Sequence, residues 1–547
     1  MPTKHDLKWR AVESALSVAS TMGQRERLLN QVVNRITDEH ELVDASIREF
    51  EYAGASEGMI LYPLVQGRSP VRNYMVCALA HAFRVRGYEP LVLLCDASLE
   101  MCMKRRHDEH DDARCAVCTH TGRKLFDAFG LDPIYLSDVP VNTGEQFSVD
   151  DPEDPFDVEY GGVDLSNFAI GSTRNRLKRN EINLEDAETR MMYEGFLRSG
   201  AHLVDATDHL LNQHDVTHVL GNHPAYLYGG VPLAAARERG VQTITIMGGK
   251  RDRTLIVGYF DDATPLPTYT DQAYLDEVLE RPLKDEQNEE LDELIEGRRD
   301  GSTVRYHYAG GADESVDADD EALMVGVFSN LMWDASLGSK AITFANPYEW
   351  VVQTLSTLTG HESVSVILKP HPAEAMRDSN RRLDHWLQRE HPELVNRIDL
   401  LPPDTDVSPY EMIADIDIGV VYSTNLALEM AIEGIPAIVA ADVHYRGHGF
   451  TIDPEGREAY LETLRNIEDI EMTAEMQTRA RRYAHLLWVR KHIPYPVYET
   501  SSKDDFGSVH ALPVDHDDLT PGNKHIDFVI DRVLAGEPVV QPLRGDN

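Results

Sequence analysis

The segment "LKPHP" (368–372) combines a cation and an imidazole at a point where regular structure must stop. Two prolines cannot continue a β-sheet or sit inside a helix, so Lys369 and His371 mark the place where an apolar run gives way to a loop. A neutral His donates one hydrogen bond, and a protonated His also neutralises phosphate. We interpret the pair as phosphate ligands, although an isolated His-Pro also occurs as an ordinary capped turn.

A second segment, "YSTNLALEMAIEG", places Ser423, Thr424 and Asn425 at the start of a predicted helix. Unpaired backbone N–H groups and the helix dipole make such a start suitable for phosphate. The same residue types are also ordinary N-caps. Glu429 lies about one turn further along, where it can reach ribose hydroxyls or remain a solvated helix charge.

A third segment, "ADVHYRGHGFTIDP" (441–454), places Arg446 in a glycine-bounded loop. Glycine allows the backbone to approach a ligand, and the planar guanidinium suits phosphate or carboxylate. Each of the three segments follows a separate apolar run. Their order on successive strand ends predicts a site for a nucleotide monophosphate or diphosphate.

The elements that carry these residues are predicted to be parallel strands separated by helices. The apolar runs of the first half are "GMILYPLVQGRSP" (58–70), "VTHVLGN" (216–222) and "VQTITIMGG" (241–249). Those of the second half are "ALMVGVFS" (322–329), "VSVILKP" (364–370), "IDIGVVYS" (416–423) and "IPAIVAAD" (435–442). This alternation predicts an α/β fold with two doubly wound, Rossmann-type domains facing a cleft, where ligands bind at the carboxyl ends of strands.

The composition divides the chain into five parts. We predict a helical lead-in (1–50), an N-terminal acceptor-side domain (51–262), an acidic connector (263–320), a C-terminal donor-binding domain (321–495) and a tail (496–547). The tail contains several prolines and a short helical pattern. It could pack back across the N-terminal domain.

The charge balance excludes one class of partner. The 547 residues contain 52 Lys and Arg against 93 Asp and Glu, a net charge of −41. Nucleic-acid binding needs basic surface, so we exclude it. Asp and Glu are spread along the whole chain, which indicates a halophilic source, where high salt screens the repulsion between these negative charges. The sequence has no run of about 18 apolar residues, and its N-terminus lacks the apolar segment of a signal peptide. We therefore predict a cytoplasmic protein and leave open a peripheral association with the membrane.

The five cysteines all precede residue 120. Cys95, Cys102, Cys115 and Cys118 form a C-x6-C-x12-C-x2-C pattern, and Cys77 stands apart. An odd number in a cytoplasmic protein argues against a disulfide framework. Four thiolates could hold a structural zinc or an iron–sulfur cluster. The alternative is that they are ordinary small core residues.

The second half of the chain resembles a known family. The segments "FSNLMWDA", "PYEWVVQTL", "VILKPHPAE" and "YSTNLALEMAIEGIPAIVAADVHYRGHGFTID" are similar to the capsular polysaccharide glycosyltransferases of the bacterial Kdo-transferase kind. The His-Pro and Ser-Thr pairs resemble, more distantly, those of bacterial CMP-sialic acid transferases. The resemblance is dense over 322–495 and implies a GT-B architecture with sugar transfer from a nucleotide donor.

The resemblance also implies roles for single residues. His371 would contact the donor phosphate, Ser423 and Thr424 would hold it at the helix start, Glu429 would face the ribose, and Arg446 would close on the leaving group. The sialyltransferases place their general base in an acidic pair followed by Gly, and no such triplet stands at a comparable strand end here.

Candidates for the missing base come from the first domain. They are His223 in "GNHPAY" and Asp164 in "GGVDLSN". We expect Arg174 in "GSTRNR" to contact an acceptor or anion. Lys250 and Arg251 in "GGKRDRT" follow a strand end and are expected to bind an anionic acceptor or a donor carboxylate.

We therefore predict a glycosyltransferase that moves a sugar from a nucleotide-activated donor, CMP-linked and acidic in preference to UDP-linked. The acceptor would be a surface polysaccharide or a lipid-linked glycan. Lys369, His371 and the helix start would replace a catalytic metal. Two other enzyme activities fit a similar cleft, transfer from a CDP-polyol phosphate donor and epimerisation of a UDP-sugar. A non-catalytic nucleotide-binding member of a glycan assembly pathway is the alternative of another class.

Overall fold

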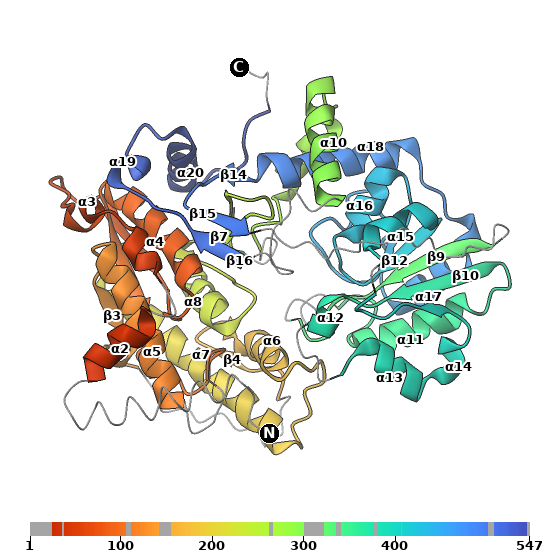
Figure 1. Cartoon of the computed structure of the whole chain (residues 1–547), viewed down its shortest axis with the longest axis horizontal. Helices are drawn as coiled ribbons and strands as arrows, with labels where there is room; N and C mark the ends of the chain where they lie inside the picture. Colours follow the sequence, from red (N-terminus) through yellow and green to blue (C-terminus); the bar gives the residue numbers. More distant parts are fainter. Residues whose placement is uncertain are drawn as a thin grey trace.

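A computed structural model gives the fold of the chain (Figure 1). It describes residues 25–34, 38–105, 111–141, 155–261, 266–299, 322–334, 341–376, 381–405, 407–501 and 508–543. Much of the predicted lead-in and residues 300–320 of the predicted connector lie outside these residues. From the lead-in, helix α2 (Arg25–Val33) contacts α5 (Asp111–Ala128).

The N-terminal domain is built on a seven-stranded sheet in the order β14-β8-β7-β6-β1-β2-β3. Five of its strands are parallel: β1 (Gly58–Tyr62), β2 (Tyr88–Leu94), β3 (Pro133–Tyr135), β6 (Val216–Gly221) and β7 (Gln242–Gly248). At one edge β8 (Thr254–Tyr259) and β14 (Ile493–Pro494) are antiparallel to their neighbours. The apolar runs are buried on both faces, as parallel strands covered by helices require.

Helices cover both faces of this sheet. One apolar cluster lies under α4 (Pro70–Arg84), α5 and α20 (Lys524–Ala535). The other lies under α6 (Leu165–Leu177), α7 (Ala187–Gln213) and α8 (Leu227–Glu238). None of the helices in the described ranges combines the length and the apolar character needed to cross a bilayer.

The C-terminal domain repeats the plan with five parallel strands in the order β11-β10-β9-β12-β13. They are β9 (Leu323–Phe328), β10 (Val364–Lys369), β11 (Asp399–Leu400), β12 (Ile418–Val421) and β13 (Ala437–Val439). One face packs on α11 (Pro347–Leu358), α13 (Leu383–Glu390) and α17 (Arg457–Arg465). The other packs on α10 (Asp285–Arg299), α16 (Leu426–Glu433) and α18 (Ala474–Ala484).

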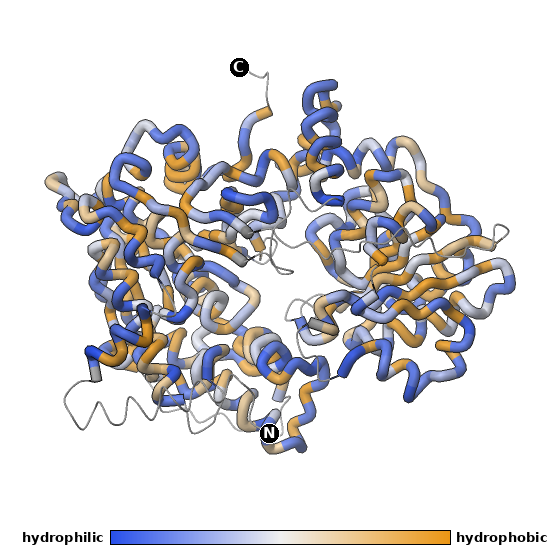
Figure 2. Tube along the Cα trace, in the orientation of Figure 1, coloured by the Kyte–Doolittle hydropathy of each residue, from blue (hydrophilic) through white to orange (hydrophobic). Residues whose placement is uncertain are grey.

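The predicted fold class, two doubly wound α/β domains of GT-B type, is confirmed. The two domains lie side by side in Figure 1, and apolar strands form the middle of each in Figure 2. In the N-terminal sheet the strand order reverses between β1 and β6, and in the C-terminal sheet it reverses between β9 and β12. Ligands of such sheets bind outside the carboxyl ends of the strands at these switch points.

Two segments join the domains. Helices α9 (Gln272–Glu280) and α10, within the predicted connector, pack against α18 and the following π-helical turn η5 (His485–Arg490). After η5 the chain returns to the N-terminal domain, where β14 pairs with β8 and α20 contacts α4. Buried tyrosines fix this return: the Tyr495 hydroxyl donates to the carbonyl of Met75 at 2.7 Å.

Candidate functional site

A cavity of about 420 Å³ lies between the domains, where the loops of both switch points meet. The N-terminal side supplies the start of α4 and the loops after β6 and β7. The C-terminal side supplies the loops after β9, β10 and β12. Polar and charged residues lining it are Arg72, His223, Lys250, Arg298, Ser329, Lys369, His371, Tyr410, Thr424, Asn425 and Glu429. The sequence-predicted residues among them are thus brought together from four separate segments, the loops after β6, β7 and β10 and the start of α16.

The "LKPHP" loop supplies the C-terminal wall. The ring nitrogen Nδ1 of His371 accepts a hydrogen bond from the backbone N–H of Ala373 at 3.1 Å. The backbone N–H of His371 donates to the Ser329 hydroxyl at 3.2 Å. In the neutral imidazole the proton therefore resides on Nε2, which makes that nitrogen a donor. Lys369 is buried, with 2% of its surface exposed, and its Nζ donates to the carbonyl of Pro402 at 3.4 Å. The loop thus presents a fixed donor beside a cation.

Burial also sets the charge of Lys369. It lowers the pKa of the ammonium to about 8, because the charged form loses solvation. An anion that contacts Lys369 binds best when the lysine side chain is protonated and positively charged. The protonated fraction of a group with this pKa falls roughly tenfold between pH 7 and pH 9. Ligand binding at the cavity should therefore weaken as pH rises through 8.

We expect the affinity for a bound nucleotide to fall up to about tenfold between pH 7 and pH 9. Lys369→Arg is the matched control, because a guanidinium stays charged over this range. Isothermal titration at each pH measures both proteins. An identical pH profile for the parent chain and Lys369→Arg would remove Lys369 from anion binding.

The start of α16 forms the floor of the cavity. Thr424 and Asn425 line it, and the Asn425 side-chain oxygen contacts His444 Nε2 at 2.8 Å. The helix can lie this close to β12 because Gly419 has no side chain. A Cβ there would stand 2.1 Å from the sulfur of Met430.

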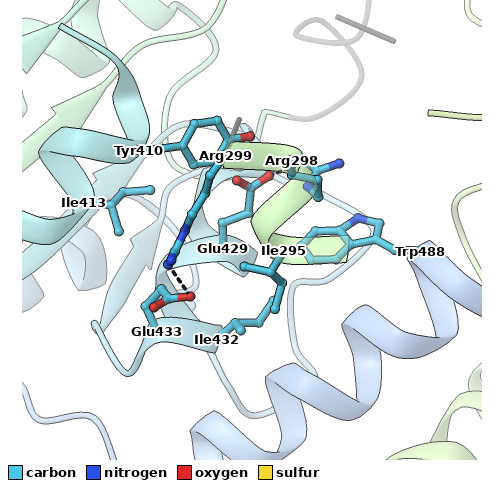
Figure 3. Close-up of a pocket in the computed structure, with 9 residues that line it drawn as sticks. All are labelled: Ile295, Arg298, Arg299, Tyr410, Ile413, Glu429, Ile432, Glu433 and Trp488. Atoms are coloured by element: carbon cyan, nitrogen blue, oxygen red, sulfur yellow. Dashed lines mark hydrogen bonds and ion pairs between the residues drawn. The ribbon is translucent and has the colours of Figure 1, made fainter. Parts of the chain in front are cut away.

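Glu429 belongs to the cavity, but its carboxylate already has a partner. Figure 3 shows the adjoining small pocket, in which Glu429 pairs with Arg298 from α10. The Arg298 guanidinium lies 4.4 Å from the centre of the Trp488 ring. A neighbouring pair, Arg299–Glu433 at 2.6 Å, joins the same two helices. Contact of Glu429 with a ribose would therefore share the carboxylate with Arg298.

His223 enters the cavity from the opposite, N-terminal wall. Its backbone is left-handed, with φ of 51°, a conformation that is uncommon outside glycine and concentrates at functional sites. Helix α8 begins directly above it and needs Gly229, since a Cβ there would stand 2.1 Å from the carbonyl oxygen of Asn222. The consecutive glycines of "LYGG" are thus explained by the close approach of α8 to this loop.

Cations gather on the same wall. The Arg72 guanidinium donates to the Tyr228 hydroxyl at 3.1 Å, and the Lys250 backbone N–H donates to His492 Nε2 at 3.0 Å. A second cavity of about 320 Å³ continues from there and is lined by Arg68, Arg72, Lys104 and His223. Sequence reasoning missed Arg68 and Arg72; the signal was two arginines in "QGRSPVRN", directly after the first apolar run of an acidic chain.

Five predicted residues do not line the cleft cavities. The backbone N–H of Ser423 donates to the Asn330 side chain at 3.0 Å. The other four already have partners within the protein. Asp164 caps the start of α6, and Arg174 Nε donates to the carbonyl of Asn180. The Arg251 guanidinium donates to the carbonyl of Trp488, and the Arg446 guanidinium donates to the carbonyls of Val439 and Pro454. The glycine-bounded loop therefore folds around its own arginine, and the predicted contact of Arg446 with a leaving group stays a prediction.

The four cysteines of the predicted metal site line one small cavity of their own. Within the described ranges, no three His, Cys, Asp or Glu side chains converge closely enough to hold a single metal ion. Cys77 is separate, buried in α4 within the core.

Comparison with known proteins gives the following. No protein-family model matches the chain, and no curated protein matches it. Among solved structures it is similar to a β-Kdo 2,7-transferase KpsC of Thermosulfurimonas dismutans, with 16% identity and a TM-score of 0.32 over 56% of this chain and 85% of that one. It is also similar to a putative UDP-N-acetylglucosamine 2-epimerase from Listeria monocytogenes, with 9% identity and a TM-score of 0.27 over 88% of this chain and 97% of that one. A third similar structure is the spinosyn rhamnosyltransferase SpnG, with 11% identity and a TM-score of 0.26 over 78% of this chain and 95% of that one.

Proposed function

We propose that the chain is a glycosyltransferase that moves a sugar from a nucleotide donor to a glycan acceptor. The observation that carries this proposal is the position of the cavity: the switch points of two doubly wound sheets open onto one space lined by cations and hydrogen-bond donors. A phosphate-linked donor on one domain and an acceptor on the other would then meet across the cleft.

The donor nucleotide is assigned to the C-terminal wall. Lys369 and His371 would contact its phosphate, together with the start of α16 at Thr424. In this arrangement these groups would stabilise the charge that develops when the sugar–phosphate bond breaks, as preorganised donors do. The described residues that line the cavity include four Arg and Lys side chains against one carboxylate, Glu429, which is paired. We therefore propose that catalysis needs no divalent ion.

The acceptor is assigned to the N-terminal wall, with His223 as general base. His223 would take the proton of an acceptor hydroxyl while its oxygen bonds to the anomeric carbon. The bond from that carbon to the donor phosphate oxygen breaks, and the nucleotide leaves with the electron pair. Arg72 and Lys250 stand where they can bind the carboxylate of an acidic sugar, which favours a CMP-linked donor. The acceptor we favour is a surface polysaccharide or a lipid-linked glycan, met in the cytoplasm or at the membrane periphery.

The test is a thermal-shift panel of CMP, CDP, UDP, GDP and ADP in high salt, on the parent chain and on His371→Ala. A ligand at a hundred times its dissociation constant adds about 2.7 kcal/mol to the folded state. We expect CMP to give the largest shift and His371→Ala to lose it. Nucleotide release from the matching sugar donor is then measured with and without a chelator.

Other outcomes would redirect the proposal. Turnover that stops with chelator and returns with magnesium would contradict the metal-independent mechanism. A new sugar nucleotide formed without any acceptor would indicate an epimerase. Tight nucleotide binding without turnover of any donor would indicate a non-catalytic member of a glycan pathway, and no shift with any nucleotide would overturn the donor site.

A further inference from the structure

Four cysteines meet at the carboxyl edge of the N-terminal sheet, beside the acceptor wall. Cys95 and Cys102 lie in the loop that follows β2. Cys115 and Cys118 lie in the first two turns of α5, three residues apart and therefore on one face of the helix. All four line a single small cavity. Two separate segments of the chain thus bring four cysteines to the wall of one cavity.

Each sulfur is met by N–H donors. The backbone N–H of Arg68 donates to Cys118 at 3.2 Å and that of Lys104 to Cys102 at 3.4 Å. The side chain of Arg105 donates to Cys115 at 3.4 Å. Cys95 faces the backbone amides of Leu99 and Ala97. N–H groups directed at sulfur stabilise the thiolate over the thiol.

The wall of the cavity shows two more features of a built site. Gln66 lines it with 6% of its surface exposed, and its Nε2 makes no hydrogen bond within the described part of the chain. The side chains of Lys104 and Arg114 also line it, as cations beside the sulfurs. Cysteines bind a metal as thiolates, and thiolates here would lie beside these two cations.

The loop geometry is specific to this arrangement. Gly67 crosses α5 so closely that a Cβ on it would stand 2.2 Å from the carbonyl oxygen of Cys118. That approach brings the N–H of Arg68, the next residue, to the Cys118 sulfur. A larger residue at position 67 would displace the donor and open the cavity.

We propose that this cavity holds an iron–sulfur cluster ligated by Cys95, Cys102, Cys115 and Cys118. A single zinc ion would need sulfurs about 2.3 Å from one point. The described residues offer no such convergence of three ligands, whereas a cluster of several irons and sulfides spreads its four thiolates over a wider volume. N–H donors to the sulfurs and neighbouring cations are features that tune and stabilise such clusters.

The cluster would organise the acceptor wall. Arg68 and Lys104 donate their backbone N–H groups to cluster cysteines, and their side chains line the 320 Å³ cavity beside His223. Ligation of the four sulfurs would therefore hold the loops that carry Arg68 and Lys104 in place, and with them two cations of the acceptor cavity. The role is structural, so no electron transfer is required, and the proposal stands independently of the proposed sugar transfer.

The test is metal analysis of the full chain prepared without oxygen, reconstituted with ferrous iron and sulfide, and desalted. We expect roughly two or four irons per chain with equal acid-labile sulfide, and visible absorbance that dithionite bleaches. Cys118→Ser should lose most of the iron and sulfide. Cys77→Ser is the matched control, because Cys77 is a buried cysteine outside the cavity, and it should keep both.

The parent chain alone can overturn the proposal, whether or not Cys118→Ser folds. One zinc per chain without sulfide would replace the cluster by a mononuclear site. Absence of iron and sulfide after reconstitution would leave four ordinary thiols. Equal iron in Cys118→Ser and the parent chain would mean adventitious binding.

Discussion

Replacing His223 with Asn should lower kcat by about 10²- to 10⁴-fold, the usual contribution of a general base. Asn tolerates the left-handed backbone that residue 223 adopts, so the loop under α8 should keep its shape. Nucleotide affinity should stay within about twofold, because the donor is assigned to the opposite wall. Steady-state kinetics and nucleotide titration on the same preparation measure both quantities.

Asp164→Asn is the matched control, as Asp164 was the other base candidate from the sequence. Asn preserves the cap of α6, so both stability and kcat should remain near those of the parent chain. The pH profile gives an independent check. A neutral imidazole is needed to accept a proton, so kcat/KM of the parent chain should fall on the acid side and that of His223→Asn should not. Loss of activity in Asp164→Asn alone would move the base to α6.

The C-terminal half of the site was accessible from sequence because its residues follow apolar runs directly. Parallel strands end at one edge of a sheet, so Lys369, His371 and Thr424 had to lie near one another once the strands were identified. Arg446, predicted by the same reasoning, does not line the cavity. Its position in the chain was suitable, but nothing in the sequence shows that the carbonyls of Val439 and Pro454 occupy its guanidinium.

The N-terminal wall and the connector were harder to predict. Arg72 lies in the first turn of α4, and its guanidinium donates to the Tyr228 hydroxyl of α8, a contact that the two arginines of "QGRSPVRN" do not reveal. Arg298 lies in a stretch dominated by acidic residues that predicts an exposed connector. Leu291 and Leu294 nevertheless bury α10 against the C-terminal domain, and this docking carries Arg298 to Glu429. Such contacts depend on tertiary packing between distant segments, which local patterns do not encode.

Replacing Glu429 with Ala should lower the free energy of unfolding by about 3 kcal/mol. The side chains of Arg298 and Glu429 are 12% and 10% exposed, so removing the carboxylate would leave a buried guanidinium without its anion. Glu433→Ala is the matched control on the same helix. Its pair with Arg299 is 47% and 34% exposed, and its loss should cost less than about 1 kcal/mol. Urea unfolding followed by circular dichroism and Trp fluorescence compares the two variants.

A double variant separates the pair from the cost of an orphaned charge. Replacing both Arg298 and Glu429 with Met should restore most of the lost stability, because apolar substitutes of similar volume often match a buried ion pair. The Trp488 ring, which now lies 4.4 Å from the guanidinium, would then pack on a thioether. Equal losses in Glu429→Ala and Glu433→Ala would show that Arg298 reaches solvent. If the double variant regains its stability and still binds nucleotide, the pair serves only to dock α10; if nucleotide binding is lost, Glu429 also contacts the donor.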